Sequence, residues 1–270
     1  MQITMSDVHV RGRRAVMLEL GGLTLTTGQA VLLAGEPGQG LTALALAATG
    51  RLSPFDGTVT LVDDDGATTT DPAELRRVTA VVDLPGVSEP DDAVPLGTVV
   101  AEDLALARVP AGPGATRRWL AEHDLSDRAG LRVDDIPGDL RTELLATLAA
   151  ERPDVRFLVL TMPERHGGEP ARWWQLAQEL AALGYGVLVQ CSRSCARDLG
   201  ADVPPARSEA DAPAPVEALR TTPPAAPARP RTGAPESTDP TQLLDAADEP
   251  EPAPRRRRRA GRATRDGREG

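Results

Sequence analysis

Lysine does not occur in this chain of 270 residues, so all 30 of its positively charged side chains are arginines. Without a side-chain amine, the chain cannot form a Schiff base, use a lysine as a general base, or place a lysine on the phosphates of a nucleotide. Two cysteines and three scattered histidines are too few for a structural zinc site. Because the cysteines show no disulfide pattern, we expect a reducing compartment.

Long hydrophobic runs are also missing. The longest ones, such as Ala30–Ala34, are far shorter than the roughly 18 residues that a membrane-spanning helix needs. The first ten residues alternate in the manner of a strand and lack the apolar centre of a secretory signal. The sequence therefore predicts a cytoplasmic protein, whose membrane association, if any, is peripheral and at the inner face of the cell membrane.

Composition divides the chain near residue 204. Thirteen of the 25 prolines lie between Pro204 and Pro254, in a segment with too little apolar surface to offset its ordering entropy. We therefore expect a folded domain over residues 1–204 and a disordered Pro/Ala-rich tail over residues 205–270, ending in the cluster Arg255–Arg259. The tail has 12 Arg and 11 acidic residues, which leaves the domain with 18 Arg and 29 acidic residues. An acidic domain is unsuited to nucleic acid, whereas the arginine cluster suits an anionic membrane surface, with nucleic-acid phosphates or plain solvation as alternatives.

Within the domain, short apolar strands alternate with helical segments. The runs Ile3–Val10 and Val16–Leu20 alternate apolar and polar residues, which is typical of antiparallel edge strands. Further strands are predicted at Ala30–Ala34, Gly57–Val62, Val78–Val82, Phe157–Leu160 and Gly186–Gln190. Helices are predicted at Leu41–Ala48, Pro72–Arg77, Asp139–Ala150 and Ala171–Leu183. This alternation predicts an α/β fold with a mostly parallel sheet covered on both faces.

The segment GEPGQGLT joins a predicted buried strand to a predicted helix. Its spacing matches the phosphate-binding loop G-x-x-x-x-G-K-[ST], except that Leu41 occupies the lysine position. Glycines let successive N–H groups point at an anion, and Thr42 stands where a hydroxyl would reach Mg²⁺, but Glu36 adds an opposing charge. Taken alone, the segment is better interpreted as a tight turn. The candidate nucleotide-binding residues are Gly35, Glu36, Pro37, Gly38, Gln39, Gly40, Leu41 and Thr42.

From this loop onward, the order of segments resembles the ATP-binding cassette of ABC transporters. Residues 34–61 are similar to the family's loop, helix and following turn, and 74–86 resemble the strand that ends in the Q-loop. Residues 96–107 are similar to the start of the helical subdomain, and 136–150 stand at the signature motif and its helix. Residues 157–164 and 186–193 match the strands before Asp-Glu-Pro and the switch histidine. The resemblance covers about residues 1–204 and implies a P-loop NTPase-like fold with antiparallel edge strands and a reduced helical subdomain.

The residues that carry the chemistry of this family are replaced. Asp83 stands at the Q-loop glutamine, Thr161 at the aspartate that holds Mg²⁺, and Met162 at the glutamate that orients water. The signature Ser-Gly-Gly is replaced by Pro137, Gly138 and Asp139, and the switch histidine by Ser192. Removing one group that stabilises a transferring phosphate costs about 3–4 kcal/mol. The resemblance therefore implies no ATP hydrolysis, weak or absent ATP binding, and no retained Mg²⁺.

Because ABC cassettes couple to an integral membrane component, the resemblance implies a permease-like partner that contacts the segment around Asp83–Val99. Two alternatives stay open. One is an active ATPase whose missing residues come from a partner chain in a cassette homodimer or heterodimer. The other is a soluble scaffold or regulatory pseudo-ATPase. His166 could imitate a displaced catalytic base, but the composition of its loop, PERHGGE, favours a solvated histidine.

Overall fold

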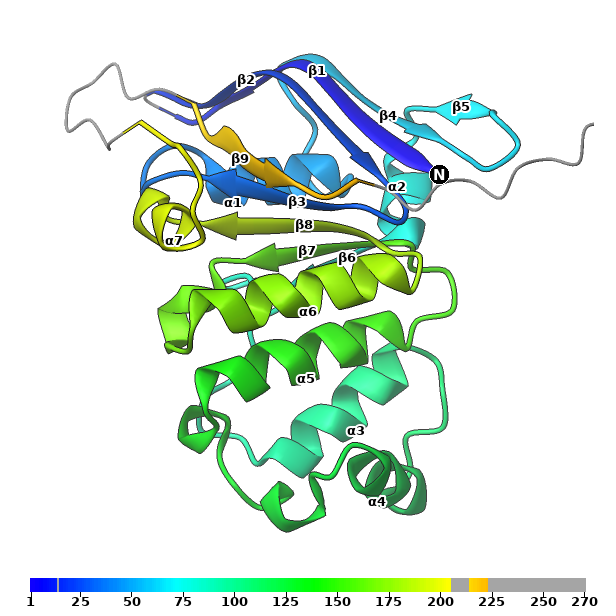
Figure 1. Ribbon diagram of the computed structural model, residues 1–270. Coiled ribbons are helices and arrows are strands. Elements are labelled where there is room, and N and C mark those ends of the chain that lie inside the picture. The colour runs from blue at the N-terminus through cyan, green and yellow to red at the C-terminus, as the bar shows by residue number, and fades with distance from the viewer. Residues whose placement is uncertain (14, 205–213, 223–270) are drawn as a thin grey trace, which may run out of the picture. The chain divides into compact units, whose positions relative to one another are not determined.

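The computed structural model describes residues 1–13, 15–204 and 214–222 (Figure 1). Its centre is a five-stranded sheet in the order β6-β7-β8-β3-β9. The strands are β3 (Ala30–Ala34), β6 (Thr79–Val82), β7 (Phe157–Thr161), β8 (Gly186–Cys191) and β9 (Val216–Arg220). The first four in this order are parallel, and β9 is antiparallel to β3. Every residue of β3, β6, β7 and β8 is buried, which explains why their sequences are mostly apolar.

The alternating segments near the start of the chain form a second, antiparallel sheet. It has the order β2-β1-β4-β5, with β1 (Gln2–Arg11), β2 (Val16–Thr26), β4 (Asp56–Val62) and β5 (Thr68–Thr69). The pairing of β1 with β4 shifts register between Ser6 and His9. At this irregularity a side chain on Gly57, whose φ is 83°, would collide with the carbonyl of Asp7. The predicted strands are therefore confirmed, and they form a separate layer.

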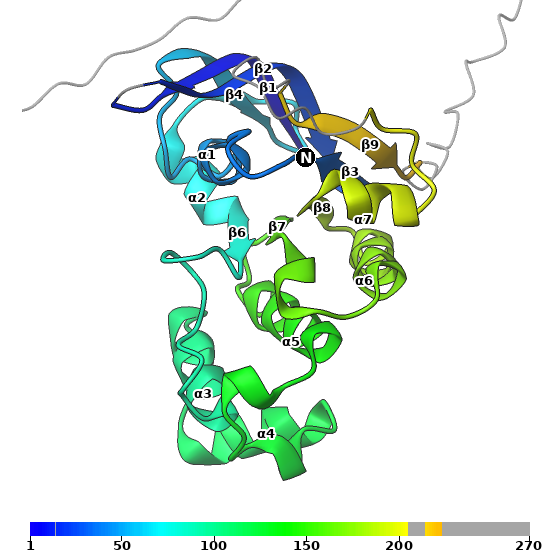
Figure 2. The same cartoon turned by 90° about the vertical axis from the view of Figure 1, so that its left-hand side faces the viewer.

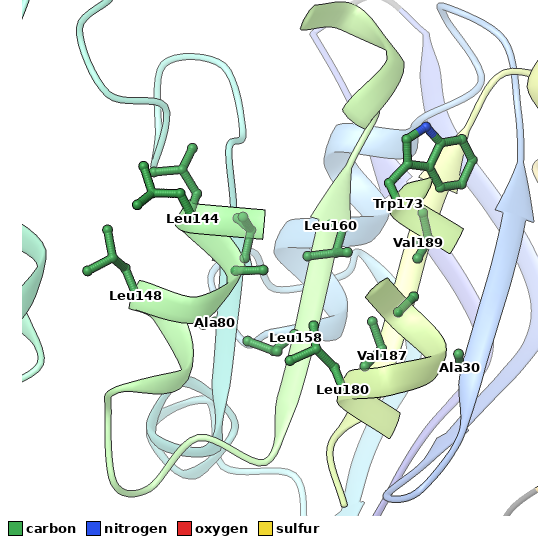
Figure 3. Close-up of a cluster of buried hydrophobic side chains, with 14 of the residues drawn as sticks. Ala30, Ala80, Leu144, Leu148, Leu158, Leu160, Trp173, Leu180, Val187 and Val189 are labelled. Carbon is green, nitrogen blue, oxygen red and sulfur yellow. The ribbon is translucent and has the colours of Figure 1, made fainter. Parts of the chain in front are cut away.

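The central sheet carries helices on both faces. Helix α1 (Leu41–Ala48) lies between the two sheets, and α2 (Pro72–Val78) packs beside it (Figure 2). The opposite face is covered by α5 (Gly138–Ala150), α6 (Pro170–Ala182) and the short α7 (Arg193–Asp198). Leu144 and Leu148 of α5 belong to the same buried apolar cluster as Leu158 and Leu160 of β7, and Figure 3 labels all four. The layers explain why the sequence alternates short apolar strands with helices.

Two further helices form a small subdomain at the end of the molecule remote from the antiparallel sheet (Figure 1). They are α3 (Leu96–Leu106) and α4 (Pro113–Glu122), followed by 3₁₀ turns η1 (Ser126–Arg128) and η2 (Val133–Asp135). The indole of Trp119 on α4 is buried, and its Nε1 donates to Glu151 Oε1 at 2.7 Å. This bond ties the subdomain to the carboxyl end of α5. The resemblance-based expectation of a reduced helical subdomain matches this arrangement.

The prediction of disorder throughout residues 205–270 is wrong for residues 216–220, which form β9. This strand pairs with β3, and the following Thr221 accepts a hydrogen bond from Ala30 N at 2.8 Å. The prediction rested on the average composition of a Pro-rich segment. The short stretch VEALR lies between the prolines and can pair with the open edge of β3. The rest of the predicted tail, including Arg255–Arg259, lies outside the described residues.

Within the described ranges, none of the helices combines the length and the apolar character needed to cross a bilayer.

Candidate functional site

The loop from Gly35 to Thr42 runs from the end of β3 to the start of α1, as its sequence predicts. Its shape is set by two glycines in the left-handed region, Gly38 with φ 93° and Gly40 with φ 80°. A side chain on Gly40 would collide with the carbonyl of Met17 on β2. Packing against the neighbouring sheet therefore demands a glycine here, whether or not an anion binds.

Hydrogen bonds within the loop hold it closed. Gln39 N donates to the Glu36 carbonyl at 3.0 Å, and Glu36 N donates to Gln39 Oε1 at 2.8 Å. The Glu36 carboxylate in turn accepts from Arg193 N, at the start of α7, at 3.3 Å. The negative charge noted in the sequence is thus partly compensated by the amide that begins another helix.

Leu41 is 7% exposed and belongs to the apolar cluster between the two sheets. Its side chain lies against Gly35, so that a Cβ on that glycine would be 3.0 Å from Leu41 Cδ2. Its carbonyl accepts from Gln190 Nε2 of β8 at 2.9 Å. The residue at the lysine position is therefore a packing residue.

A hollow of about 430 Å³ opens beside the loop. Its apolar wall comes from Val16, Met17, Leu41, Leu84, Pro85 and Met162. Its polar groups include Glu36, Thr42, Thr161, Gln190 and Arg165. Among the lining residues the only cation is Arg165, whose guanidinium is already bound to Glu89 Oε1 and to the carbonyl of Asp83. The wall of the hollow is thus more suited to apolar groups than to phosphate.

The carboxyl ends of β6 and β7 bring Asp83, Thr161 and Met162 together. Thr161 Oγ1 lies 2.8 Å from the carbonyl oxygens of Val82 and of Asp83, so its hydroxyl hydrogen bonds one strand end to the next. Met162 adopts a left-handed conformation with φ 47°, and its amide donates to the Gln190 carbonyl at 2.9 Å. Thr161 and Met162 add no carboxylate to this end of the sheet.

Asp83 is bound by Arg141 of α5 through both carboxylate oxygens. Arg141 Nε donates to Oδ2 and Nη2 to Oδ1, each at 3.0 Å, and the two side chains are 7% and 2% exposed. Arg141 Nη1 also donates to Asp92 Oδ1 at 2.7 Å. Burial lowers the pKa of Arg141, but its hydrogen bonds to Asp83 and Asp92 outweigh burial and raise the pKa. The hydrogen bond from Arg141 likewise lowers the pKa of Asp92.

His166, at the end of η3 (Pro163–His166), joins the same network. Its Nε2 lies 3.1 Å from Asp83 Oδ2, and its side chain is 20% exposed. Burial lowers the pKa of His166, and the charges of Arg141 and Arg165 lower it further, against the attraction of Asp83. Arg165 Nη2 also lies 3.2 Å from His166 Nε2, so the ring lies between a carboxylate and a guanidinium. The prediction of a solvated histidine is therefore wrong, because loop composition does not reveal a buried carboxylate nearby.

The positions of the signature and switch motifs also have partners within the chain. Gly138 is the first residue of α5 and lies against η3, the turn that follows β7. A side chain at this position would collide with the carbonyl of His166. Asp139 Oδ1 accepts from Glu169 N at 3.0 Å. Ser192 is the N-cap of α7, where its Oγ accepts from Cys195 N at 3.3 Å. Pro137 is the N-cap residue of α5, without a side-chain hydrogen bond.

Glu164 is a residue of the site that sequence analysis missed. Its Oε1 accepts from Ser192 N at 2.6 Å, while Oε2 is buried without a partner among the described residues. Burial raises the pKa of Glu164. Arg141 was missed as well, although it stands three and seven residues before Leu144 and Leu148, on the apolar side of the predicted helix. A charged residue on that side is the signal that could have revealed the buried pair.

These groups do not fit a triphosphate with Mg²⁺. The ligand atoms of Asp83, Glu89 and His166 lie within 4.8 Å of one another, which is the spacing of a metal site. However, Arg141 and Arg165 already bind these acids, so a divalent cation would have to displace two guanidinium groups. At the loop, an apolar side chain and a carboxylate stand where phosphate would need positive charge.

Comparisons with known proteins agree on the fold. No protein-family model matches the sequence, and no curated protein matches it. The structure of an ATP-binding subunit of an ABC transporter is similar with a TM-score of 0.52 at 17% identity, over 73% of this chain and 82% of that one. A nucleotide-free ATP-binding cassette from an ABC transporter gives 0.53 at 18% identity, over 72% and 82%. The dimeric MJ0796, a bacterial ABC transporter cassette, gives 0.55 at 19% identity, over 72% and 90%.

The chain therefore has the fold of an ABC transporter ATP-binding cassette, as the order of its segments implies.

Removing one partner of the buried pair tests its structural role. We expect Arg141→Met to lower the free energy of unfolding by about 3–5 kcal/mol, because it leaves the Asp83 carboxylate buried without its cation. The matched control is Arg132→Met, which breaks the exposed pair with Asp134 and should cost less than about 1 kcal/mol. Urea denaturation measures both values. Equal losses in the two variants would contradict the assignment.

The lowered pKa of His166 predicts a pH dependence of stability. Because the folded state binds this proton less readily than the unfolded state, whose histidine has its ordinary pKa of 6.5, stability falls as pH drops below about 6.5. His166→Gln should flatten this part of the stability curve. The matched control is His9→Gln, at a histidine that is 42% exposed and lies outside this network. Urea midpoints between pH 5 and pH 8 give the comparison, and an unchanged slope in His166→Gln would refute it.

Proposed function

We propose that this chain works as a cassette subunit that couples to an integral membrane component without hydrolysing ATP. The observation that carries the proposal is that residues at the motif positions bind other parts of the same chain. Asp83 binds Arg141, Thr161 joins two strand ends, and Asp139 holds the loop before α6. Several positions that would act on nucleotide or water in the family therefore support the fold here.

Nucleotide binding is expected to be weak or absent. The loop offers backbone N–H groups and the amino end of α1, which favour an anion. Leu41 supplies no charge to the phosphates, and Glu36 repels them. A backbone cradle without a cation supports millimolar affinity at most, or about −4 kcal/mol. Mg²⁺ would lack a carboxylate at Thr161 and Met162, so we do not expect it to be held.

The membrane partner is expected to bind near the loop that follows β6. Val87 in this loop is 54% exposed, although it is a large apolar residue. It borders a hollow of about 240 Å³ between α3, α5 and β6, which Asp103 and Leu145 also line. Leu106, which is 75% exposed, lines the same hollow, and neighbouring exposed apolar side chains favour an interface with a protein segment. Val87 lies within the segment 83–99 expected from the resemblance, and the surface around it suits a permease-like protein.

A second candidate function is an active ATPase completed by another cassette, as a homodimer or heterodimer. Val16 and Met17, beside the loop, are 49% and 46% exposed. A partner chain covering them would also cover the hollow and could bring the missing lysine and glutamate. MJ0796, one of the similar structures, is a dimer. A soluble scaffold or regulatory pseudo-ATPase is the third interpretation of the same fold.

For localisation we propose the cytoplasm, with the protein peripheral at the inner face of the cell membrane when its partner is bound. The cluster Arg255–Arg259 would add attraction to anionic lipids of about 1 kcal/mol per residue near the surface. These residues lie outside the described part of the chain, so their role stays a prediction.

Purified protein with Mg²⁺ and ATP should show no turnover above background and only millimolar binding by calorimetry. Leu41→Lys restores the cation at the loop, and we expect it to tighten ATP binding about ten- to hundredfold, since a charge-assisted hydrogen bond contributes about 1.5–3 kcal/mol. It should not restore hydrolysis, because Thr161 and Met162 still lack carboxylates. Leu183→Lys, at a residue that is 77% exposed, is the control and should not alter binding. Turnover by the unmodified chain would contradict the proposal, and turnover only with a second cassette would favour the dimer.

Co-expression with the membrane proteins encoded beside it, followed by pull-down, tests the partner surface. We expect Val87→Asp to reduce the recovered membrane component at least tenfold, because a charge would enter an apolar contact. Leu183→Asp places the same charge on another exposed apolar residue and should recover the component normally. Failure of the unmodified chain to recover any membrane protein would favour the soluble scaffold.

A further inference from the structure

The hollow beside the loop before α1, which we name the loop hollow, has the size of a small-molecule site. Its volume is about 430 Å³. Ligand sites typically measure about 300–1,000 Å³ and are lined mainly by apolar side chains with a few polar groups. The start of β2, the loop with the first turn of α1, and the residues that follow β6 and β7 all contribute to the wall. The loop hollow is therefore built by several elements of the fold together.

Packing fixes the apolar part of this wall. Leu41 and Leu84 are 7% and 2% exposed, and both belong to the apolar cluster between the two sheets. Met162 packs against the same cluster. Val16 and Met17 complete the wall and are exposed to solvent. Because the removal of apolar surface from water is favourable, a ligand with an apolar body gains by covering these side chains.

Two of the four methionines of the chain, Met17 and Met162, line the loop hollow. A methionine side chain is flexible and polarizable, so it adapts to the shape of a ligand and makes favourable contacts with aromatic rings. The described residues that line the hollow include no phenylalanine, tyrosine or tryptophan. An aromatic ligand therefore suits this lining, because it supplies the rings that the two sulfur atoms favour.

The charges of the lining favour a ligand without net charge. Among the described residues that line the hollow, Glu36 is the only acid and Arg165 the only base. The Glu36 carboxylate accepts from Arg193 N at 3.3 Å, and the Arg165 guanidinium binds Glu89 Oε1 and the Asp83 carbonyl. Each charge thus already has a partner within the chain. A charged group of a ligand would be removed from water here without a counter-ion, which is costly.

Hydrogen-bond donors lie in the same wall. Helix α1 begins after Gly40, which provides no side-chain cap, so the amides of its first turn have no partner within the helix. Leu41, Thr42 and Ala43 of this turn all line the hollow, and Thr42 adds an exposed hydroxyl. Because Glu36 repels an anion, these donors suit an uncharged oxygen better than a carboxylate or a phosphate. Together with the apolar wall, they suit an organic ligand with one polar end.

We propose that the loop hollow binds an uncharged aromatic molecule that carries one oxygen acceptor. The rings cover Leu41, Leu84 and Met162, and the oxygen accepts a hydrogen bond from the first turn of α1. This binding goes beyond the coupling function proposed above and does not depend on a membrane partner. The ligand and the phosphates of a nucleotide exclude each other, because both require residues 35–42. The apolar residue at position 41 then has a use in binding as well as in packing.

Prodan, an uncharged naphthalene with one ketone oxygen, is the probe. Its emission moves to shorter wavelength in apolar surroundings, and titration with the full-length chain should give this change with a Kd of roughly 10–200 μM. Met17→Asp should raise the Kd at least tenfold, because a charge enters the apolar wall at an exposed position. Met17→Leu keeps the wall apolar and should change the Kd less than about twofold. The matched control is Leu183→Asp, which places the same charge on an exposed apolar residue outside the hollow.

The methyl signals of the methionines locate the bound probe. Isotope labelling of these methyl groups gives four NMR signals, one for each methionine of the chain. We expect prodan to shift the signals of Met17 and Met162, which line the hollow, and to leave those of Met1 and Met5 unchanged. Met5 is buried between the two sheets, so its unchanged signal also shows that each variant is folded.

Three results would overturn the proposal. They are the absence of prodan binding, equal shifts of all four methionine signals, and equal affinities of Met17→Asp and Leu183→Asp for the probe. A dimer of the unmodified chain that excludes prodan, and that Met17→Asp dissociates, would also overturn it, because a second cassette would then cover the hollow. Sedimentation velocity of the unmodified chain and of Met17→Asp detects this last case.

Discussion

The ion pair between Asp83 and Arg141 connects segments that are far apart in sequence. The carboxylate follows β6, the guanidinium comes from α5, and His166 approaches from the loop after β7. Both charges are removed from water, so their attraction must offset the cost of desolvation, and only a bidentate geometry with further hydrogen bonds achieves this. The pair therefore fixes α5 against the carboxyl end of β6. Thr161, which bonds to the Asp83 carbonyl, depends on the same arrangement.

The loop before α1 shows that the glycine pattern of a phosphate-binding loop can also be required by packing. Gly40 is needed because the carbonyl of Met17 leaves no room for a side chain, and this requirement exists without any ligand. Leu41 is retained by the apolar cluster between the sheets. The pattern of glycines thus has a packing cause as well as a phosphate-binding one. Only the charged residues distinguish the two causes, and the charged residue of this loop, Glu36, disfavours phosphate.

Much of the fold could be predicted from local sequence. The bounds of α1 and β3 agree with prediction because an unbroken apolar run and a glycine turn are local features. The environment of His166 and the partner of Arg141 could not be predicted, since both depend on Asp83, more than fifty residues away. The strand β9 was missed for a similar reason. Its five residues have little strand character alone, and the edge of β3 that accepts them is almost 190 positions earlier in the chain.

The pairing of β9 with β3 gives part of the segment after residue 204 an architectural role. Without it, β3 would present a row of free amides and carbonyls at the margin of a buried sheet, where another chain could attach and begin aggregation. Gln29, Ala30 and Thr221 strengthen this closure through three hydrogen bonds of 2.8–2.9 Å. Selection must therefore preserve the few residues of the proline-rich extension that form β9, even if the residues around them change freely.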